Sequence, residues 1–82
     1  MKYIIFEDFS GRPVPFLFPQ RVDHGDMRDQ LPYAKVLSAG YVELKDGVFR
    51  CYGGSTELAA TAASTDAAVI AEKFAPREGS PA

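Results

Sequence analysis

The dipeptide Asp46-Gly47 constrains the fold of this chain more than any other feature of its sequence. Asp-Gly is a favoured pair for the two-residue type I′ turn of a β-hairpin, in which both turn residues adopt positive φ. A turn at this point pairs the segment before it with the segment after it, and this pairing places the apolar side chains on one face of the hairpin. This agreement between turn and face pattern predicts a register. The expected pairs are Lys45 with Val48, Leu44 with Phe49, Glu43 with Arg50, Val42 with Cys51, and Tyr41 with Tyr52.

The second face of this hairpin is a candidate binding surface. It would carry an ion pair between Glu43 and Arg50, flanked by Tyr41 and Tyr52. Tyrosine and arginine are enriched at the energetic centres of protein interfaces. An ordinary solvated sheet face and a face covered by helices are the alternatives. Gly40, just before the hairpin, indicates a β-bulge or a close approach of backbone.

Two apolar runs, KYIIFE (residues 2–7) and VPFLF (residues 14–18), predict a first hairpin with a turn at residues 8–13. Pro15 places the second run at a sheet edge or at a bulge. Both runs are apolar on both faces, whereas an antiparallel strand with one wet face should alternate. Either the domain's own helices or a second protein must therefore cover them, and Phe16 and Phe18 are candidate contact residues.

The segment VDHGDMRD (residues 22–29) contains the single histidine of the chain. Asp23 is placed to cap a short helix over residues 24–31, and the acids suit its positive end. A metal site normally needs three or four ligands, and these side chains cannot all reach one ion from one helical turn. We therefore expect a helix start with an exposed His24 and no metal. The remaining candidate is an acidic binding edge made of Asp23, Asp26 and Asp29.

The C-terminal half predicts one further helix. Gly53 and Gly54 end the second hairpin, and residues 55–60 fit either a strand or a loop. Ser64 or Thr65 then caps a helix from Asp66 to Phe74. The expected fold is α+β: an antiparallel sheet of four to five strands from two hairpins, with two short helices packed on one face. One domain spans residues 1–75, and residues 76–82 form a disordered tail.

Composition excludes several classes of protein. The 82 residues allow a single domain, the net charge is −2, and the basic residues are scattered, so nucleic-acid binding is not expected. The sequence has neither a signal-peptide pattern nor a bilayer-length apolar run, and one cysteine forms no disulfide, which predicts a cytoplasmic protein. Cys51 is expected to be buried and His24 to lie at the surface, so we expect no catalytic pair, no enzyme activity and no cofactor.

Four stretches of the chain together resemble small proteins from bacteriophage and prophage genomes. That family has no activity that would assign a catalytic residue. The resemblance implies a phage or prophage context, a bacterial cytosol, and a role in countering host defence. The stretches are FLFPQRVDH (16–24), VLSAGYVEL (36–44), FRCYGGSTEL (49–58) and STDAAVIAEKF (64–74).

The leading prediction is a non-enzymatic protein that binds a bacterial host protein or complex and inhibits a defence complex, in the manner of an anti-CRISPR protein. One alternative is a phage structural or assembly accessory that forms a homodimer through its first hairpin. Another is a small enzyme or ligand-binding protein that uses His24 and Cys51. The residues assigned to the binding surface are Phe16, Phe18, Asp23, Asp26, Asp29, Tyr41, Arg50 and Tyr52.

Overall fold

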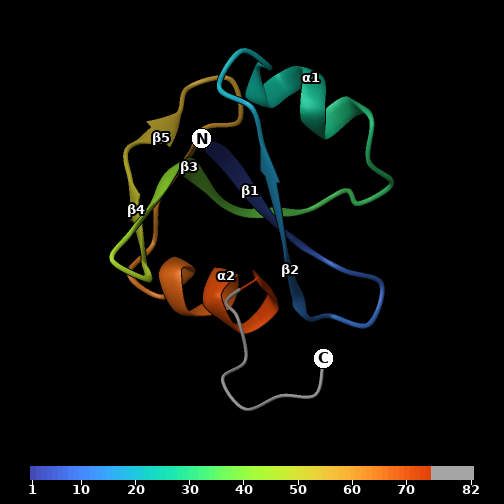
Figure 1. The fold of residues 1–82 in the computed structure, drawn as a ribbon. Helices are drawn as coiled ribbons and strands as arrows, with labels where there is room; N and C mark the ends of the chain where they lie inside the picture. The colour runs from blue at the N-terminus through green and yellow to red at the C-terminus, as the bar shows by residue number, and fades with distance from the viewer. Residues whose placement is uncertain (75–82) are drawn as a thin grey trace.

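The computed structural model describes residues 1–74, and the tail predicted for residues 76–82 lies outside this range. Its centre is a four-stranded antiparallel sheet in the order β2-β1-β3-β4 (Figure 1). The expected α+β class and the antiparallel sheet are confirmed. The strands of this sheet are β1 (Lys2–Glu7), β2 (Pro13–Phe18), β3 (Val36–Lys45) and β4 (Val48–Tyr52).

The β3–β4 hairpin has the predicted register at all five positions, from Tyr41 opposite Tyr52 to Lys45 opposite Val48. Asp46 and Gly47 have φ values of 53° and 78°, as a type I′ turn requires. The first hairpin also forms, with β1 and β2 paired from Lys2 opposite Phe18 to Glu7 opposite Pro13. Both predicted hairpins form in this sheet, but it has four strands and no fifth, because the two later strands form a separate sheet.

The strand β1 lies in the middle of the sheet, because it also pairs with β3 from Lys2 opposite Tyr41 to Phe6 opposite Val36. The register shifts between Ile5 and Phe6, so the irregularity faces Leu37 and not the predicted bulge site, Gly40. Gly40 instead meets the predicted close approach: a Cβ there would lie 2.6 Å from the carbonyl oxygen of Tyr52. Only glycine fits that contact.

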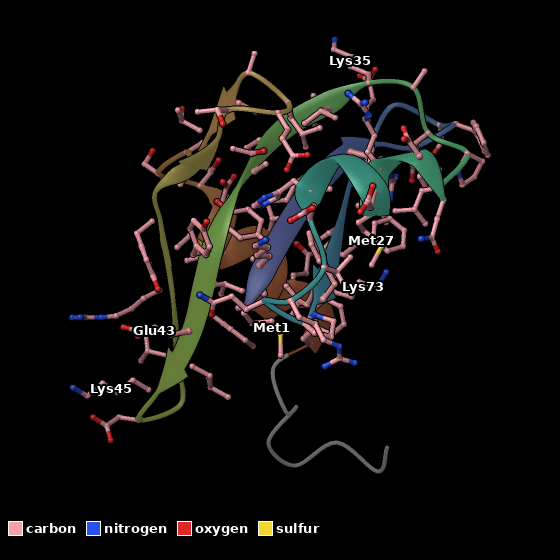
Figure 2. The ribbon with its side chains drawn as sticks, turned by 90° about the horizontal axis from the view of Figure 1, so that it is seen from above. Met1, Met27, Lys35, Glu43, Lys45 and Lys73 are labelled. Atoms are coloured by element: carbon pink, nitrogen blue, oxygen red, sulfur yellow. The ribbon has the colours of Figure 1, made fainter. Side chains whose placement is uncertain are left out.

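The two helices, α1 (His24–Asp29) and α2 (Asp66–Phe74), cover opposite faces of the sheet, so the prediction that both pack on one face is wrong (Figure 2). On one face, Tyr3 and Ile5 pack with Ile70 of α2. On the other, Ile4 and Phe6 pack with Met27 of α1. Two apolar faces on β1 need two covers, and the chain supplies both itself.

Residues 55–60, which fitted either a strand or a loop, contain parts of two short strands joined by a turn. The strands β5 (Gly54–Ser55) and β6 (Ala60–Thr61) pair as a second, two-stranded sheet. Leu58 and Ala60 from this segment pack on the same face as α1. No helix within residues 1–74 is long and apolar enough to cross a membrane.

The helix α2 begins and ends at the predicted residues, whereas α1 is shorter than predicted and ends at Asp29. Asp23 occupies the position before α1, but its side chain makes no capping hydrogen bond, so that detail of the prediction is wrong. Its carboxylate lies 3.9 Å from the ammonium of Lys2. A cation from β1 therefore competes with the helix amides for this carboxylate.

Candidate functional site

The tip of the β3–β4 hairpin projects beyond the rest of the sheet. The last backbone contact of β3 on this side is the hydrogen bond from the amide of Val42 to the carbonyl of Met1, so from Glu43 onward β3 pairs with β4 alone. Figure 2 shows Glu43 and Lys45 on this projection, away from both helices. We call residues 43–50 the arm. A two-stranded ribbon is marginally stable by itself, so the arm depends on the packing at its base.

One face of the hairpin carries the residues that the sequence marked for binding. Tyr41 and Tyr52 stack with ring centroids 5.7 Å apart and planes 23° from parallel. Tyr52 is 53% exposed, and Arg50 beside it is also exposed. We call Tyr41, Arg50 and Tyr52 the tyrosine patch. The prediction placed these side chains on one sheet face, and the structure brings them together.

The imidazole of His24 supports the tyrosine patch from below, and the prediction that it is exposed is wrong. His24 is 3% exposed. Its ring makes edge-to-face contacts with Phe18 at 5.4 Å and with Tyr41 at 5.9 Å. Its Nε2 lies 3.0 Å from the carbonyl oxygen of Gly40. Because a carbonyl only accepts, Nε2 carries the proton and donates. The histidine therefore fixes the orientation of Tyr41.

Glu43 and Arg50 lie opposite each other as predicted, but they form no ion pair among the described residues. Both side chains are exposed. An exposed pair gains little energy and loses side-chain entropy when it forms. With Cys51 and Tyr52 they line a shallow hollow of about 440 Å³. The guanidinium of Arg50 thus stays available to a partner.

The two aromatic residues predicted for the binding surface in the first hairpin belong to the core instead. Phe18 is 2% exposed and packs with Ile4. Phe16 is half-buried and meets Phe6 edge-to-face, with ring centroids 5.8 Å apart. The assignment of Phe18 to a surface is therefore wrong, because α1 and its flanking segments fill the space beside β2. Phe16 retains only a partial surface, below the ammonium of Lys73.

The acidic edge of α1 is exposed as predicted, at Asp23, Asp26 and Asp29. Within residues 1–74 no three histidine, cysteine or acidic side chains are grouped so that they could hold a metal ion. His24 joins this edge to the tyrosine patch, since the residue beside Asp23 contacts Tyr41 directly. The acids and the tyrosines therefore flank one continuous region.

A buried polar cluster on the opposite face was missed by the sequence analysis. Asp66, at the start of α2, is 3% exposed. Its carboxylate accepts hydrogen bonds from the hydroxyl of Tyr3 at 2.5 Å, from the hydroxyl of Ser38 at 2.8 Å and from the amide of Ala63 at 2.8 Å. Burial, and then the hydrogen bond to Asp66, raise the pKa of Tyr3, so the phenol remains a donor. The cluster fastens α2 to β1 and β3.

Cys51 lies on this second face, next to Tyr3, while His24 lies on the first. The sheet separates the two side chains, so they form no nucleophile–base pair, which needs direct hydrogen-bond contact. Burial raises the pKa of the Cys51 thiol, and the negative charge of Asp66 adds to that rise. A thiol held in its neutral form is a poor nucleophile.

We expect Cys51 to react with a disulfide reagent more slowly than a free cysteine at pH 8, because burial raises its pKa and lowers its thiolate fraction. The rate should climb as the pH is raised above about 8.5, the ordinary pKa of a thiol. Absorbance of the released thiolate measures the rate, and the same chain in guanidinium chloride is the control. Rapid reaction at pH 7 would contradict the protonated thiol.

The apolar face of the arm ends in an open groove of about 410 Å³. The helix α2 covers only part of this face, which leaves large apolar side chains in solvent. Leu44 is 59% exposed and Met1 is 56% exposed. The groove is lined by Met1, Leu17, Val42, Glu43, Leu44 and Phe49.

No protein-family model matches the chain, and no curated protein or solved structure matches it. The chemistry of the surface therefore carries the functional conclusion.

Proposed function

We propose that this protein acts by binding another protein, without catalysis, and that the tyrosine patch is the centre of the binding surface. The observation that carries the proposal is the stacked pair of Tyr41 and Tyr52, exposed at Tyr52 and fixed from below by buried His24. A rigid aromatic pair beside an exposed arginine loses little entropy on binding and offers a large contact area.

The electrostatics of this surface favour a partner of mixed charge. Arg50 projects from the patch, while Asp23 and Asp26 lie on the adjoining edge of α1. A partner that offers an acidic group to Arg50 and basic groups to the two aspartates would be oriented as it docks. Aromatic burial would then supply affinity, and the charges would fix the register.

The resemblance to small phage proteins supports a bacterial partner, and a host defence complex is the first class that we would test. An inhibitor of that kind occludes a surface of its target and needs no reactive group. The separation of His24 from Cys51 by the sheet is consistent with this mode of action.

The test is a panel of purified bacterial defence complexes, nuclease effectors guided by RNA among them, titrated against the immobilised chain. We expect one complex to bind, and Tyr52→Ala to weaken that binding about thirtyfold, the effect of a residue worth about 2 kcal/mol. Arg50→Ala should act in the same direction. Affinity is measured by surface plasmon resonance.

Phe9→Ala and Arg12→Ala are matched controls, because they remove an exposed aromatic ring and an exposed guanidinium from the loop at the far end of β1. Both should leave binding unchanged. A complex that binds the Tyr52 variant as tightly as the wild type would refute the patch. Failure of every complex in the panel would count against defence complexes as the partner class.

A further inference from the structure

We propose that two copies of this chain associate through the outer edge of β4 and extend the four-stranded sheet across a two-fold axis. The strand β4 is the last in the sheet order, and within the described residues 1–74 it pairs on one side only, with β3. Figure 2 shows it along the outer border of the ribbon. An open edge strand is a ready template for another strand, and native sheets protect such edges unless they are used. This inference does not depend on the proposed function, although Arg50 belongs to both surfaces.

The opposite edge of the sheet is protected, and β4 is not. The strand β2 carries Pro13 and Pro15, which lack the amide needed for a further ladder. The sequence of β4, VFRCY, contains no proline, and its pairing with β3 shows no irregularity. We therefore place self-association at β4 and not at the first hairpin.

The hydrogen-bond pattern of the hairpin identifies the free groups at this edge. A two-residue turn makes its flanking residues a hydrogen-bonded pair, and such pairs alternate along an antiparallel ladder. Val48, Arg50 and Tyr52 therefore bond to β3. The backbone amides and carbonyls of Phe49 and Cys51 therefore point away from β3. Within residues 1–74 no turn or loop forms a backbone hydrogen bond with them.

The register of the second copy follows from charge. A two-fold axis through Arg50 would place two guanidinium groups directly opposite each other, which is unfavourable. An axis through Phe49 places the two phenylalanines opposite each other as a hydrogen-bonded pair. It also sets Val48 opposite Arg50 of the second copy, with Asp46 on the diagonal. The two Arg50 side chains then move from directly opposite to diagonal positions, and each also has Asp46 of the other copy on its second diagonal.

The apolar face of the β3–β4 hairpin also favours this register. Phe49 lines the groove with Leu44, and an axis at Phe49 joins the grooves of the two copies into one apolar strip. Leu44, which is 59% exposed, then ends a row of side chains that runs through Phe49 of both copies to Leu44 of the second. A surface that complements itself in this way is characteristic of two-fold dimers. The occupant of this edge is therefore a second copy of the chain.

The first experiment measures association by sedimentation equilibrium of the full chain over a range of concentrations. We expect a monomer–dimer equilibrium, and we expect Arg50→Glu to raise its dissociation constant tenfold or more, because each introduced carboxylate would then lie diagonally across from Asp46 and from the introduced carboxylate of the other copy. Arg12→Glu, the same change of charge on the loop between β1 and β2, is the control and should leave the equilibrium unaltered. A monomer at every concentration would overturn the proposal.

The second experiment tests the register with a Cys51→Ala chain that carries either Val48→Cys or Arg50→Cys. An axis at Phe49 predicts a disulfide-linked dimer only when the two variants are mixed and oxidised, and none when either is oxidised alone. Circular dichroism confirms that each variant is folded. A covalent dimer of Arg50→Cys by itself would place the axis at Arg50 and overturn the register. If folded variants form no covalent dimer, the proposal that the chains associate through the edge of β4 is wrong.

Discussion

Replacing Asp66 with alanine is expected to lower the free energy of unfolding by about 3 to 5 kcal/mol. The substitution leaves two buried donors, the hydroxyls of Tyr3 and Ser38, and the partly buried amide of Ala63 without an acceptor. A core of this size rarely supplies more than about 3 to 5 kcal/mol of net stability. The variant should therefore be largely unfolded at room temperature.

Urea denaturation followed by far-ultraviolet circular dichroism measures the change. Glu72→Ala is the matched control, because it removes an exposed carboxylate from the same helix and should change stability by less than about 0.5 kcal/mol. Tyr3→Phe removes one hydroxyl together with its hydrogen bond, so its loss of stability should lie between those of Asp66→Ala and Glu72→Ala. Asp66→Ala with wild-type stability would show that the cluster does not hold α2 to the sheet.

Replacing His24 with alanine is expected to lower the free energy of unfolding by about 2 to 4 kcal/mol. The change empties the space between Phe18 and Tyr41 and leaves the carbonyl of Gly40 without its donor. His24→Phe should restore part of the loss, since it refills the space but donates no hydrogen bond. The difference between the two variants isolates the hydrogen bond.

This substitution has a second readout. The chain has four tyrosines and no tryptophan, so its near-ultraviolet circular dichroism reports mainly on tyrosine packing. We expect the band to weaken in His24→Ala, because Tyr41 loses its support, and to persist in the control Arg28→Ala, which is exposed on the same helix. An unchanged band in a folded His24→Ala chain would show that Tyr52 alone holds Tyr41.

The elements that the sequence predicts well are those specified by neighbours along the chain. The type I′ turn sets every pair of the β3–β4 hairpin, because Asp46 and Gly47 accept the positive φ values that few other residues tolerate. The bounds of α2 follow in the same way from the periodicity of its residues and the polar residues before it. The tyrosine patch was found because a correct register assigns every side chain to a face.

The features that the sequence analysis missed depend on contacts between distant segments. Asp66 looked like an acid at the positive end of a helix, yet its partners Tyr3 and Ser38 lie 63 and 28 positions away. His24 looked exposed because a helix start is usually at the surface, yet α1 turns that residue toward the sheet. One signal was available: a tyrosine within the buried run KYIIFE requires a polar partner.

The central place of β1 makes the domain a single cooperative unit. Its partners in β3 lie 30 to 39 positions further along the chain, from Phe6 with Val36 to Lys2 with Tyr41. The pairing of β1 with β3 joins the two hairpins, and both hydrophobic clusters pack against these strands. A break anywhere in residues 19–35 would divide both layers at once, so we expect neither fragment to keep a core of its own.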